Sequence, residues 1–136
     1  MPDPMLTTEQ LHELMPLAAH LGVAVVSARP EQVVGSLDWA AYLTTAGGAL
    51  HGGALMTLAD CVGATCAFLN LPDGSLTSTT SSSTVFLRAA RDGVVTATAR
   101  PLHVGRSTIA VRTDITDGSG RLVAQATQSQ AVLAGV

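Results

Sequence analysis

Aromatic side chains make up only 3% of this sequence, and charged side chains only 12%. Because aromatics are so scarce, any core must be built from Ala, Val, Leu and Ile. A disordered chain is excluded, since apolar residues reach 47% while charge is low. The length of 136 residues suits a single domain, residues 1–136, and so many apolar side chains indicate that some are buried between subunits.

Basic residues are also few: Lys and Arg together number seven, and the net charge is −3. No basic run or mixed basic and aromatic patch is present, so no nucleic-acid partner is expected. Residues 1–10 lack the basic-then-apolar order of a signal peptide. The longest apolar stretch, residues 54–71, is interrupted by Asp60 and two threonines, which argues against a membrane span. We therefore expect a cytoplasmic protein without a membrane partner.

The two cysteines, Cys61 and Cys66, lie five positions apart, which points them to different faces of a helix. Neither a disulfide nor a metal site is favoured, and both thiols are expected to be inert packing groups. The sequence also lacks a Gly-x-Ser-x-Gly elbow, a phosphate-binding loop, a dinucleotide fingerprint and a metal-type His/Cys spacing. No metal or redox cofactor is therefore expected.

The predicted elements run from a short helical region to two strands, one long helix and four longer strands. Thr7 and Gln10 form a capping box at the helical start, Pro16 breaks or restarts that helix, and Gly22 ends it. Residues 40–50 are expected to form a loop. Strands are predicted at 23–29, 32–39, 75–87, 94–103, 107–116 and 122–133, and the long helix at 53–69.

The Ser/Thr-rich run 77–84 has two interpretations, a flexible linker or a strand. A strand is favoured because the run contains no Gly or Pro, four of its eight residues are β-branched, and it continues into Val85. The long helix 53–69 is apolar on almost every side, which predicts that it is buried. One buried helix followed by antiparallel strands predicts an α+β fold, with a curved antiparallel sheet wrapped around a long central helix.

Asp60 is the one carboxylate in that long helix. Burying a carboxylate without partners is costly, so its presence needs a reason. One reason is structural, because a core aspartate can bond to a hydroxyl or pair across a subunit interface. The other is functional: Gly53, Thr57, Gly63 and Ala64 share its helical face and, being small, leave space for a substrate.

His51, Gly52 and Gly53 precede and open the same helix. Two glycines let a ligand approach the first-turn N–H groups, which are unpaired and lie at the positive end of the helix dipole. Such donors can hold a developing oxyanion, although an ordinary loop-to-helix turn also explains the motif. Gly53 and Asp60 are roughly 10 Å apart along a helix, so the two groups would meet in a site shared by two subunits.

A third group of polar residues lies near predicted strand ends. His103, Arg106 and Ser107, together with Arg88 and Arg91, could present backbone and guanidinium groups to a phosphate. The alternative is a solvated hairpin end that binds no ligand.

Residues 51–60, His-Gly-Gly-Ala-Leu-Met-Thr-Leu-Ala-Asp, resemble the signature of hotdog-fold acyl-CoA thioesterases. The similarity is greatest to the PaaI-like group, which includes one type of 4-hydroxybenzoyl-CoA thioesterase and the 1,4-dihydroxy-2-naphthoyl-CoA thioesterases. It runs from residue 37 to residue 133 and includes segments 85–88, 101–107 and 117–123. The resemblance implies a hotdog fold and a homodimer, often a homotetramer, with active sites between subunits.

The resemblance also implies roles for the matching residues. Asp60 would be the catalytic carboxylate, acting either as nucleophile or as general base for a water. The backbone N–H of Gly52 in the other subunit would bind the oxyanion, with His51 and Gly53 shaping that loop. Thr79 falls near a position where relatives often carry a Ser or Thr that contacts water. Coenzyme A is part of the substrate, so no separate cofactor is implied.

Two substrate-binding positions depart from the family pattern. Thr45 stands six residues before the His, where relatives often carry Asn or Gln, and Ala64 stands four residues after the carboxylate, where relatives often carry Ser or Thr. The predicted function is hydrolysis of an aryl- or medium-chain acyl-CoA. The departures motivate an alternative, a non-catalytic hotdog protein that binds an acyl-CoA or serves as an assembly subunit. A hotdog hydratase is disfavoured because it needs a paired His and acid, and no His lies near Asp60 along the helix.

Overall fold

The computed structural model describes residues 5–135, so the ends of the predicted domain, residues 1–4 and 136, lie outside the described residues. Two short helices are followed by two strands, a 3-10 turn, the long helix and four strands. In chain order these are α1 (Thr8–Leu14), α2 (Pro16–Leu21), β1 (Ala24–Arg29), β2 (Gln32–Asp38), the 3-10 turn (Ala41–Leu43), α3 (Gly52–Leu69), β3 (Leu76–Phe86), β4 (Val94–Val104), β5 (Thr108–Thr116) and β6 (Leu122–Leu133).

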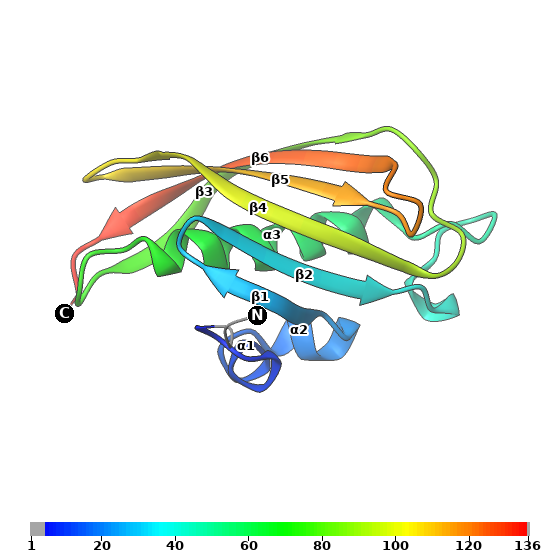
Figure 1. The fold of residues 1–136 in the computed structure, drawn as a ribbon, viewed down its shortest axis with the longest axis horizontal. Coiled ribbons are helices and arrows are strands. Elements are labelled where there is room, and N and C mark those ends of the chain that lie inside the picture. Colours follow the sequence, from blue (N-terminus) through cyan, green and yellow to red (C-terminus); the bar gives the residue numbers. More distant parts are fainter. Residues whose placement is uncertain (1–4, 136) are drawn as a thin grey trace.

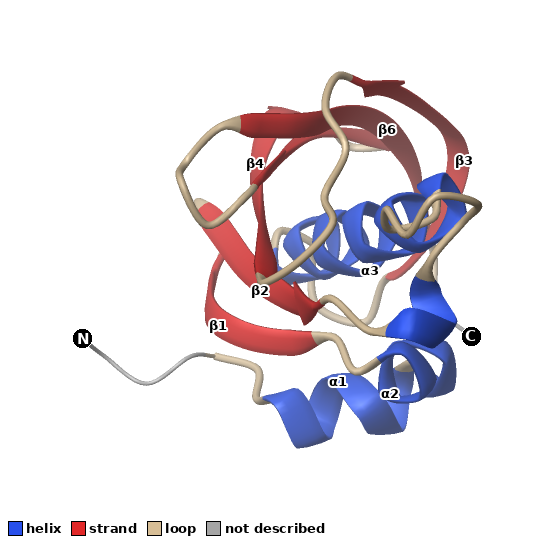
Figure 2. Cartoon of the chain, turned by 90° about the vertical axis from the view of Figure 1, so that its right-hand side faces the viewer, coloured by secondary structure: helices blue, strands red, loops and turns tan. Residues whose placement is uncertain are grey.

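The strands form one six-stranded sheet in the order β1-β2-β4-β5-β6-β3, and every neighbouring pair is antiparallel. The sheet curves around α3, while α1 and α2 lie beyond β1 on the side that the sheet leaves open (Figures 1 and 2). This is the α+β arrangement predicted from the sequence, a curved antiparallel sheet around a central helix. The predicted hotdog fold is therefore confirmed.

Local signals in the sequence explain most element boundaries. Thr7 and Gln10 form the predicted capping box, α2 restarts at Pro16, and Gly22 caps its end. The predicted limits of the strands and of α3 differ from the observed ones by no more than one residue. The predicted loop 40–50 differs from the structure, because it contains the short 3-10 turn.

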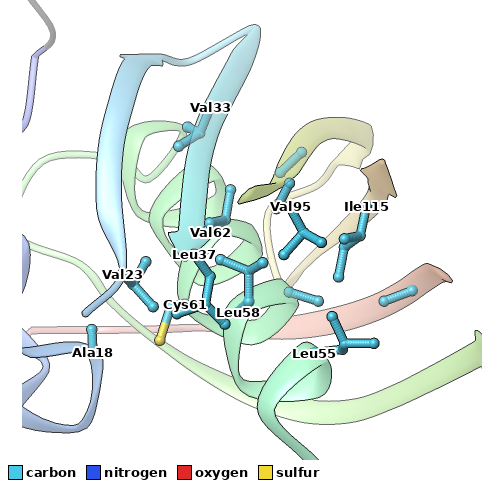
Figure 3. Close-up of a cluster of buried hydrophobic side chains, with 14 of the residues drawn as sticks. Ala18, Val23, Val33, Leu37, Leu55, Leu58, Cys61, Val62, Val95 and Ile115 are labelled. Atoms are coloured by element: carbon cyan, nitrogen blue, oxygen red, sulfur yellow. The ribbon is translucent and has the colours of Figure 1, made fainter. Parts of the chain in front are cut away.

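The core lies between α3 and the concave face of the sheet. Leu58 and Val62 of α3 pack with Leu37 of β2 and Val95 of β4, and each of these side chains is at most 3% exposed (Figure 3). Gly35 of β2 permits the close approach of helix and sheet, because a Cβ there would lie 2.6 Å from Val62 Cγ2. The aromatic-poor core predicted from composition is confirmed.

One face of α3 is not covered by the rest of the chain, so the prediction that this helix is buried on every side is wrong. Met56, Asp60 and Phe68 are exposed on this face, at spacings of four and eight residues that align them along the helix. The remaining faces contact the sheet, and α2 contacts only part of the open side. Asp60 is therefore accessible in the single chain rather than buried.

Helix α3 is also long and apolar enough to cross a membrane, with 18 residues and a mean hydropathy of 1.5. However, 56% of it is buried inside the fold, as in the core helix of a folded domain. Length and composition alone are therefore weak evidence for a membrane span.

Strand β3 forms an edge of the sheet and contains the Ser/Thr-rich run. The run pairs residue by residue with β6, with one bulge between Thr79 and Ser81. Its assignment to a strand rather than a linker is confirmed. Most of its side chains are exposed, and its second edge has no partner strand within the described residues.

Candidate active site

Asp60 lies at the middle of α3, where its carboxylate meets side chains of the sheet. Its Oδ1 accepts a hydrogen bond from Gln128 Nε2 at 2.9 Å and one from Thr79 Oγ1 at 3.1 Å. Thr79, a residue selected from the sequence, is therefore in direct contact with the carboxylate. Both donors are neutral, and they come from β6 and β3, so the sheet rather than the helix orients this group.

Gln128 and Gln130 of β6 are the site residues that the sequence interpretation missed. Gln128 is 2% exposed and Gln130 is fully buried, which is unusual for such a polar side chain. Gln130 Nε2 donates to Thr79 Oγ1 at 2.7 Å, and Thr77 Oγ1 donates to Gln130 Oε1 at 3.1 Å. The sequence did indicate that these glutamines are buried, because alternate residues of a strand face the same side. Gln128 and Gln130 therefore share the inward face of Ala124 and Ala126.

The role predicted for Gly63 is wrong. It was expected to leave substrate space beside Asp60, but a Cβ at Gly63 would overlap Oε1 of Gln128. The space that this glycine creates is thus filled by the amide of Gln128. The missing side chain allows a buried strand residue to reach a carboxylate on the outer side of the helix.

The space open to a substrate lies instead on the uncovered face of α3. A cavity of about 440 Å³ borders Asp60, and most of its exposed lining is apolar. It is lined by Met15, Leu17, Met56, Thr57, Asp60, Cys61, Thr79 and Ser82. No histidine is among these lining residues.

A second cavity of about 220 Å³ continues toward the C-terminal end of α3. Met15 and Thr79 line both cavities, and Ala64 and Phe68 contribute to the second one. Ala64 is thus near the site, as predicted from the sequence. Thr65 does not replace the hydroxyl missing at Ala64, because its Oγ1 donates to the backbone oxygen of Cys61 at 2.7 Å.

The His-Gly-Gly segment forms the N-terminus of α3. His51 is the N-cap residue, and its Nδ1 accepts a hydrogen bond from the Gly53 N–H at 2.8 Å. A neutral His51 therefore carries its proton on Nε2. Within residues 5–135 the Gly52 N–H has no hydrogen-bond partner, so it is the donor that this helix start leaves available. Along the helix it lies roughly 12 Å from Asp60, too far for one carbonyl to contact both in a single chain.

The five predicted phosphate-binding residues do not form one cluster in a single chain, and Arg91 lines a separate pocket with Gly93 and Asp117. Arg88 follows β3 and lines a cavity of about 370 Å³ together with Gly52. His103, Arg106 and Ser107 lie at the β4–β5 hairpin, at the opposite end of the sheet. Strand direction therefore separates Arg88 from the hairpin residues within one chain, and their predicted role in binding a phosphate stays a prediction.

Thr45 lies away from both cavities beside Asp60. It is exposed in the loop before α3, where its N–H donates to the backbone oxygen of Ala49 at 2.9 Å. The indole of Trp39 fixes this loop by donating to the backbone oxygen of Gly48. In a single chain, Thr45 therefore does not line the space beside Asp60.

Both cysteines are buried and free. Burial, with a smaller contribution from the charge of Asp60, raises the pKa of Cys61 to about 11, and burial raises the pKa of Cys66 to about 11. Both thiols therefore stay protonated near neutral pH, as expected of packing groups rather than nucleophiles. Over residues 5–135, no group of three or more His, Cys, Asp or Glu side chains could hold a metal ion.

Comparison with known proteins links this geometry to a family. The profile of the thioesterase superfamily matches residues 47–124, which include the N-terminus of α3, Asp60 and Thr79. A protein of Vibrio cholerae named as an esterase is 31% identical over 107 residues, covering 79% of this chain and 71% of its own length.

Solved structures support the same relationship. A thioesterase from Haemophilus influenzae is 25% identical, with a TM-score of 0.88 over 97% of this chain and 94% of its own. The PaaI protein of the Escherichia coli phenylacetic acid degradation operon has a TM-score of 0.85 over 96% of this chain and 93% of its own, and its 23% identity supports the shared fold. The predicted resemblance is confirmed.

Proposed function

Because the chain belongs to the thioesterase superfamily, we propose that it is a thioester hydrolase that cleaves an acyl-CoA, with an aryl or medium-chain acyl group, and that Asp60 is its catalytic carboxylate. The observation that carries the proposal is the position of Asp60. Its Oδ1 is held by Gln128 and Thr79, and it borders a mostly apolar cavity of about 440 Å³. A charged acceptor beside apolar space suits an acyl group whose carbonyl carbon must be attacked.

Two routes of hydrolysis are compatible with this carboxylate. As a general base, Asp60 takes a proton from a water, the hydroxide attacks the thioester carbonyl carbon, and the C–S bond breaks as the CoA sulfur accepts a proton. As a nucleophile, an Asp60 oxygen attacks that carbon and expels the CoA thiolate. Water then cleaves the resulting anhydride to release the acid and restore the carboxylate.

The oxyanion donor would come from a second subunit. The Gly52 N–H, which has no hydrogen-bond partner in the described part of the chain, lies at a helix N-terminus and suits a developing negative charge, but it is roughly 12 Å from Asp60 of the same chain. The exposed face of α3 and the edge of β3 that has no partner strand among residues 5–135 offer surfaces for pairing two copies. We therefore propose a homodimer in which Asp60 of one subunit acts with Gly52 of the partner subunit, with tetramers built from such dimers.

The two separated groups of basic residues fit such a shared site. Arg88 lies at the Gly52 end of the molecule, and Arg106 at the β4–β5 hairpin with His103 and Ser107. In a dimer, groups from opposite ends of two chains can approach one CoA molecule, whose phosphates would pair with guanidinium groups. The proposed reaction needs no cofactor beyond the CoA of its substrate, and we place the enzyme in the cytoplasm.

Hydrolysis of a panel of aryl-CoA and straight-chain acyl-CoA thioesters tests the proposal, with thiol release as the readout. We expect turnover of at least one substrate class, and loss of roughly 100-fold or more of kcat in Asp60→Asn. The matched control is Asp114→Asn. Asp114 also accepts a hydrogen bond from a glutamine of β6, at 2.8 Å, but lies outside the cavity. A folded Asp60→Asn variant with parental rates on every substrate would overturn the proposed site.

A second candidate is a non-catalytic protein that binds an acyl-CoA or serves as an assembly subunit. It is favoured by Ala64, which supplies no hydroxyl, and by Thr45, which lies away from the cavity. Binding of acyl-CoA without thiol release anywhere in the same panel would support this candidate. Turnover abolished by Asp60→Asn would exclude it.

A further inference from the structure

We propose that Gln128 is a positioning residue, which fixes the Asp60 carboxylate so that Oδ2 is the oxygen that reacts. This inference rests on the proposed role of Asp60 in thioester hydrolysis. It extends that role to a buried amide on another element of the fold.

The two oxygens of Asp60 have different surroundings. Oδ1 accepts both hydrogen bonds, from Gln128 Nε2 and from Thr79 Oγ1. Oδ2 accepts none within residues 5–135. Two donors on one oxygen restrict rotation of the carboxylate and leave the lone pairs of the other oxygen available. A water or a thioester carbon can therefore approach Oδ2 without displacing a protein donor.

Both donors are held in place by the sheet. Gln128 is 2% exposed, and a buried side chain with a hydrogen-bond partner has little freedom to change rotamer. Gln130 Nε2 donates to Thr79 Oγ1 at 2.7 Å, so the only proton of the Thr79 hydroxyl is left for Asp60. The direction of each hydrogen bond in this chain of contacts is thus defined, and all of them lead to Oδ1.

Helix α3 is adapted to the reach of Gln128. Asp60 and Gly63 are three residues apart and therefore lie on adjacent turns of the helix. A side chain at Gly63 would overlap the Gln128 amide oxygen, so the amide reaches Asp60 only because this position is glycine. Packing alone does not explain a glutamine at position 128, because an apolar side chain would fill the same space. A glutamine also supplies the N–H donor that holds the Asp60 carboxylate.

The neutrality of the donors matters for the chemistry. Asp60 takes part in no ion pair within the part of the chain that the structure describes. A Lys or Arg at this distance would hold the negative charge more strongly and weaken the carboxylate as a base or nucleophile. Amide and hydroxyl donors orient it at a smaller loss of reactivity, which is the expected property of a supporting group.

The main test compares Gln128→Leu with Gln125→Leu on the best substrate of the panel. Gln125 lies on the same strand and donates to another carboxylate, Asp114, at 2.8 Å, so it is a matched control. We expect Gln128→Leu to lower kcat roughly tenfold or more with little change in KM, and Gln125→Leu to leave kcat unchanged. Thermal unfolding identifies any loss that comes from instability rather than positioning.

Gln128→Glu adds a readout that a purely structural role would not move. While protonated, the introduced carboxyl donates to Asp60 as the amide does, and once ionised it repels the neighbouring charge. We expect the kcat of this variant, relative to the parent, to be highest at acidic pH and to fall as pH rises through the pKa of the introduced carboxyl. Gln128→Leu is expected to stay low at every pH.

These outcomes separate the inference from the proposed function. If Asp60→Asn loses activity while folded Gln128→Leu keeps the parental kcat, the positioning role is wrong and the proposed function stands. If folded Asp60→Asn keeps activity, the proposed site itself is wrong, and the positioning role falls with it. A pH-dependent rescue in Gln128→Glu, together with the loss in Gln128→Leu, supports both.

Discussion

Cys61 shows how strongly the surroundings of a single side chain control its chemistry. It directly follows Asp60 and lines the same cavity, yet it is 6% exposed. Burial, and to a smaller extent the charge of Asp60, raises the pKa of Cys61 to about 11. The thiolate is the reactive form, so at pH 8 only roughly one Cys61 thiol in a thousand is ionised.

The ionisation of Cys61 can be followed by alkylation in a Cys66→Ala background, where it is the only thiol. We expect slow reaction with iodoacetamide at pH 8 and a rate that rises roughly tenfold per pH unit as the pKa of about 11 is approached. Asp60→Asn removes the smaller cause, so the pKa of Cys61 falls and alkylation becomes faster at the same pH. In a Cys61→Ala background, the rate for Cys66 should not respond to Asp60→Asn, because burial alone raises its pKa. A Cys61 that reacts at pH 8 like an exposed thiol would contradict this account.

At the scale of elements, the sequence predicts the fold well because its local signals are strong. The capping box at Thr7 and the restart at Pro16 are set by neighbouring residues, so they can be recognised without tertiary context. The strands are bounded by turns and alternate in polarity, and even the Ser/Thr-rich run of β3 is assigned correctly. Side-chain periodicity carried most of this information.

The errors concern which surfaces are covered. The apolar composition of α3 predicts burial, but it cannot reveal that the sheet leaves the face of Met56 and Asp60 open. Gly63 suggests empty space, yet a residue 65 positions later in the chain fills that space. Gln128 lies on a strand whose neighbours are fixed only by the strand order of the whole sheet, so its contact with Asp60 is a property of topology.

The break between α1 and α2 places Met15 at a point that controls the shape of the site. Met15 lies between the two helices with a non-helical backbone, φ −129° and ψ 87°, and it lines both cavities. We expect Met15→Ala to join the cavities and shift the preference toward longer acyl chains. Met15→Trp should shift it toward shorter ones. Each methylene group of the acyl chain that becomes buried in the cavity, or is excluded from it, changes kcat/KM roughly fourfold.

The measurement is kcat/KM for a series of straight-chain acyl-CoA substrates. Met5→Ala is the matched control, because Met5 is 52% exposed and lines neither cavity. A chain-length profile that Met15→Ala and Met15→Trp leave unchanged would place the acyl group elsewhere.

At the scale of the whole molecule, the open face of α3 and the free edge of β3 belong to the same side of the fold. Exposed Leu14, Leu17, Met56 and Phe68 make this side apolar, in a chain with few charges elsewhere. Such a surface is characteristic of an interface between subunits. Within residues 5–135 the Gly52 N–H has no hydrogen-bond partner, and in the proposed homodimer it would act with the Asp60 carboxylate of the partner subunit.

Gly52→Pro isolates the contribution of the Gly52 N–H. Gly52 is the first helical residue after the N-cap, a position where proline is tolerated and removes only the N–H. The preceding residue, His51, already has the extended backbone that proline requires, with φ −62° and ψ 138°. Gly52→Ala is the matched control, because it adds the same Cβ beside Phe86, 3.2 Å from Cζ, and keeps the N–H. We expect Gly52→Pro to lower kcat roughly 100-fold and Gly52→Ala to retain most of it.

Mixing two inactive variants then tests whether each site draws on both subunits. If Asp60 acts with Gly52 of the partner subunit, a mixed dimer of Asp60→Asn and Gly52→Pro subunits collects both defects in one site and leaves the other site intact. Random exchange makes about half the dimers mixed, each with one working site of two, so activity should recover to roughly a quarter of the parental value. If both groups acted within one chain, every site would carry one defect and mixing would restore nothing. An affinity tag on the Asp60→Asn subunit, used to capture the untagged Gly52→Pro subunit after mixing, establishes that mixed dimers form, so recovery or its absence decides between the two arrangements.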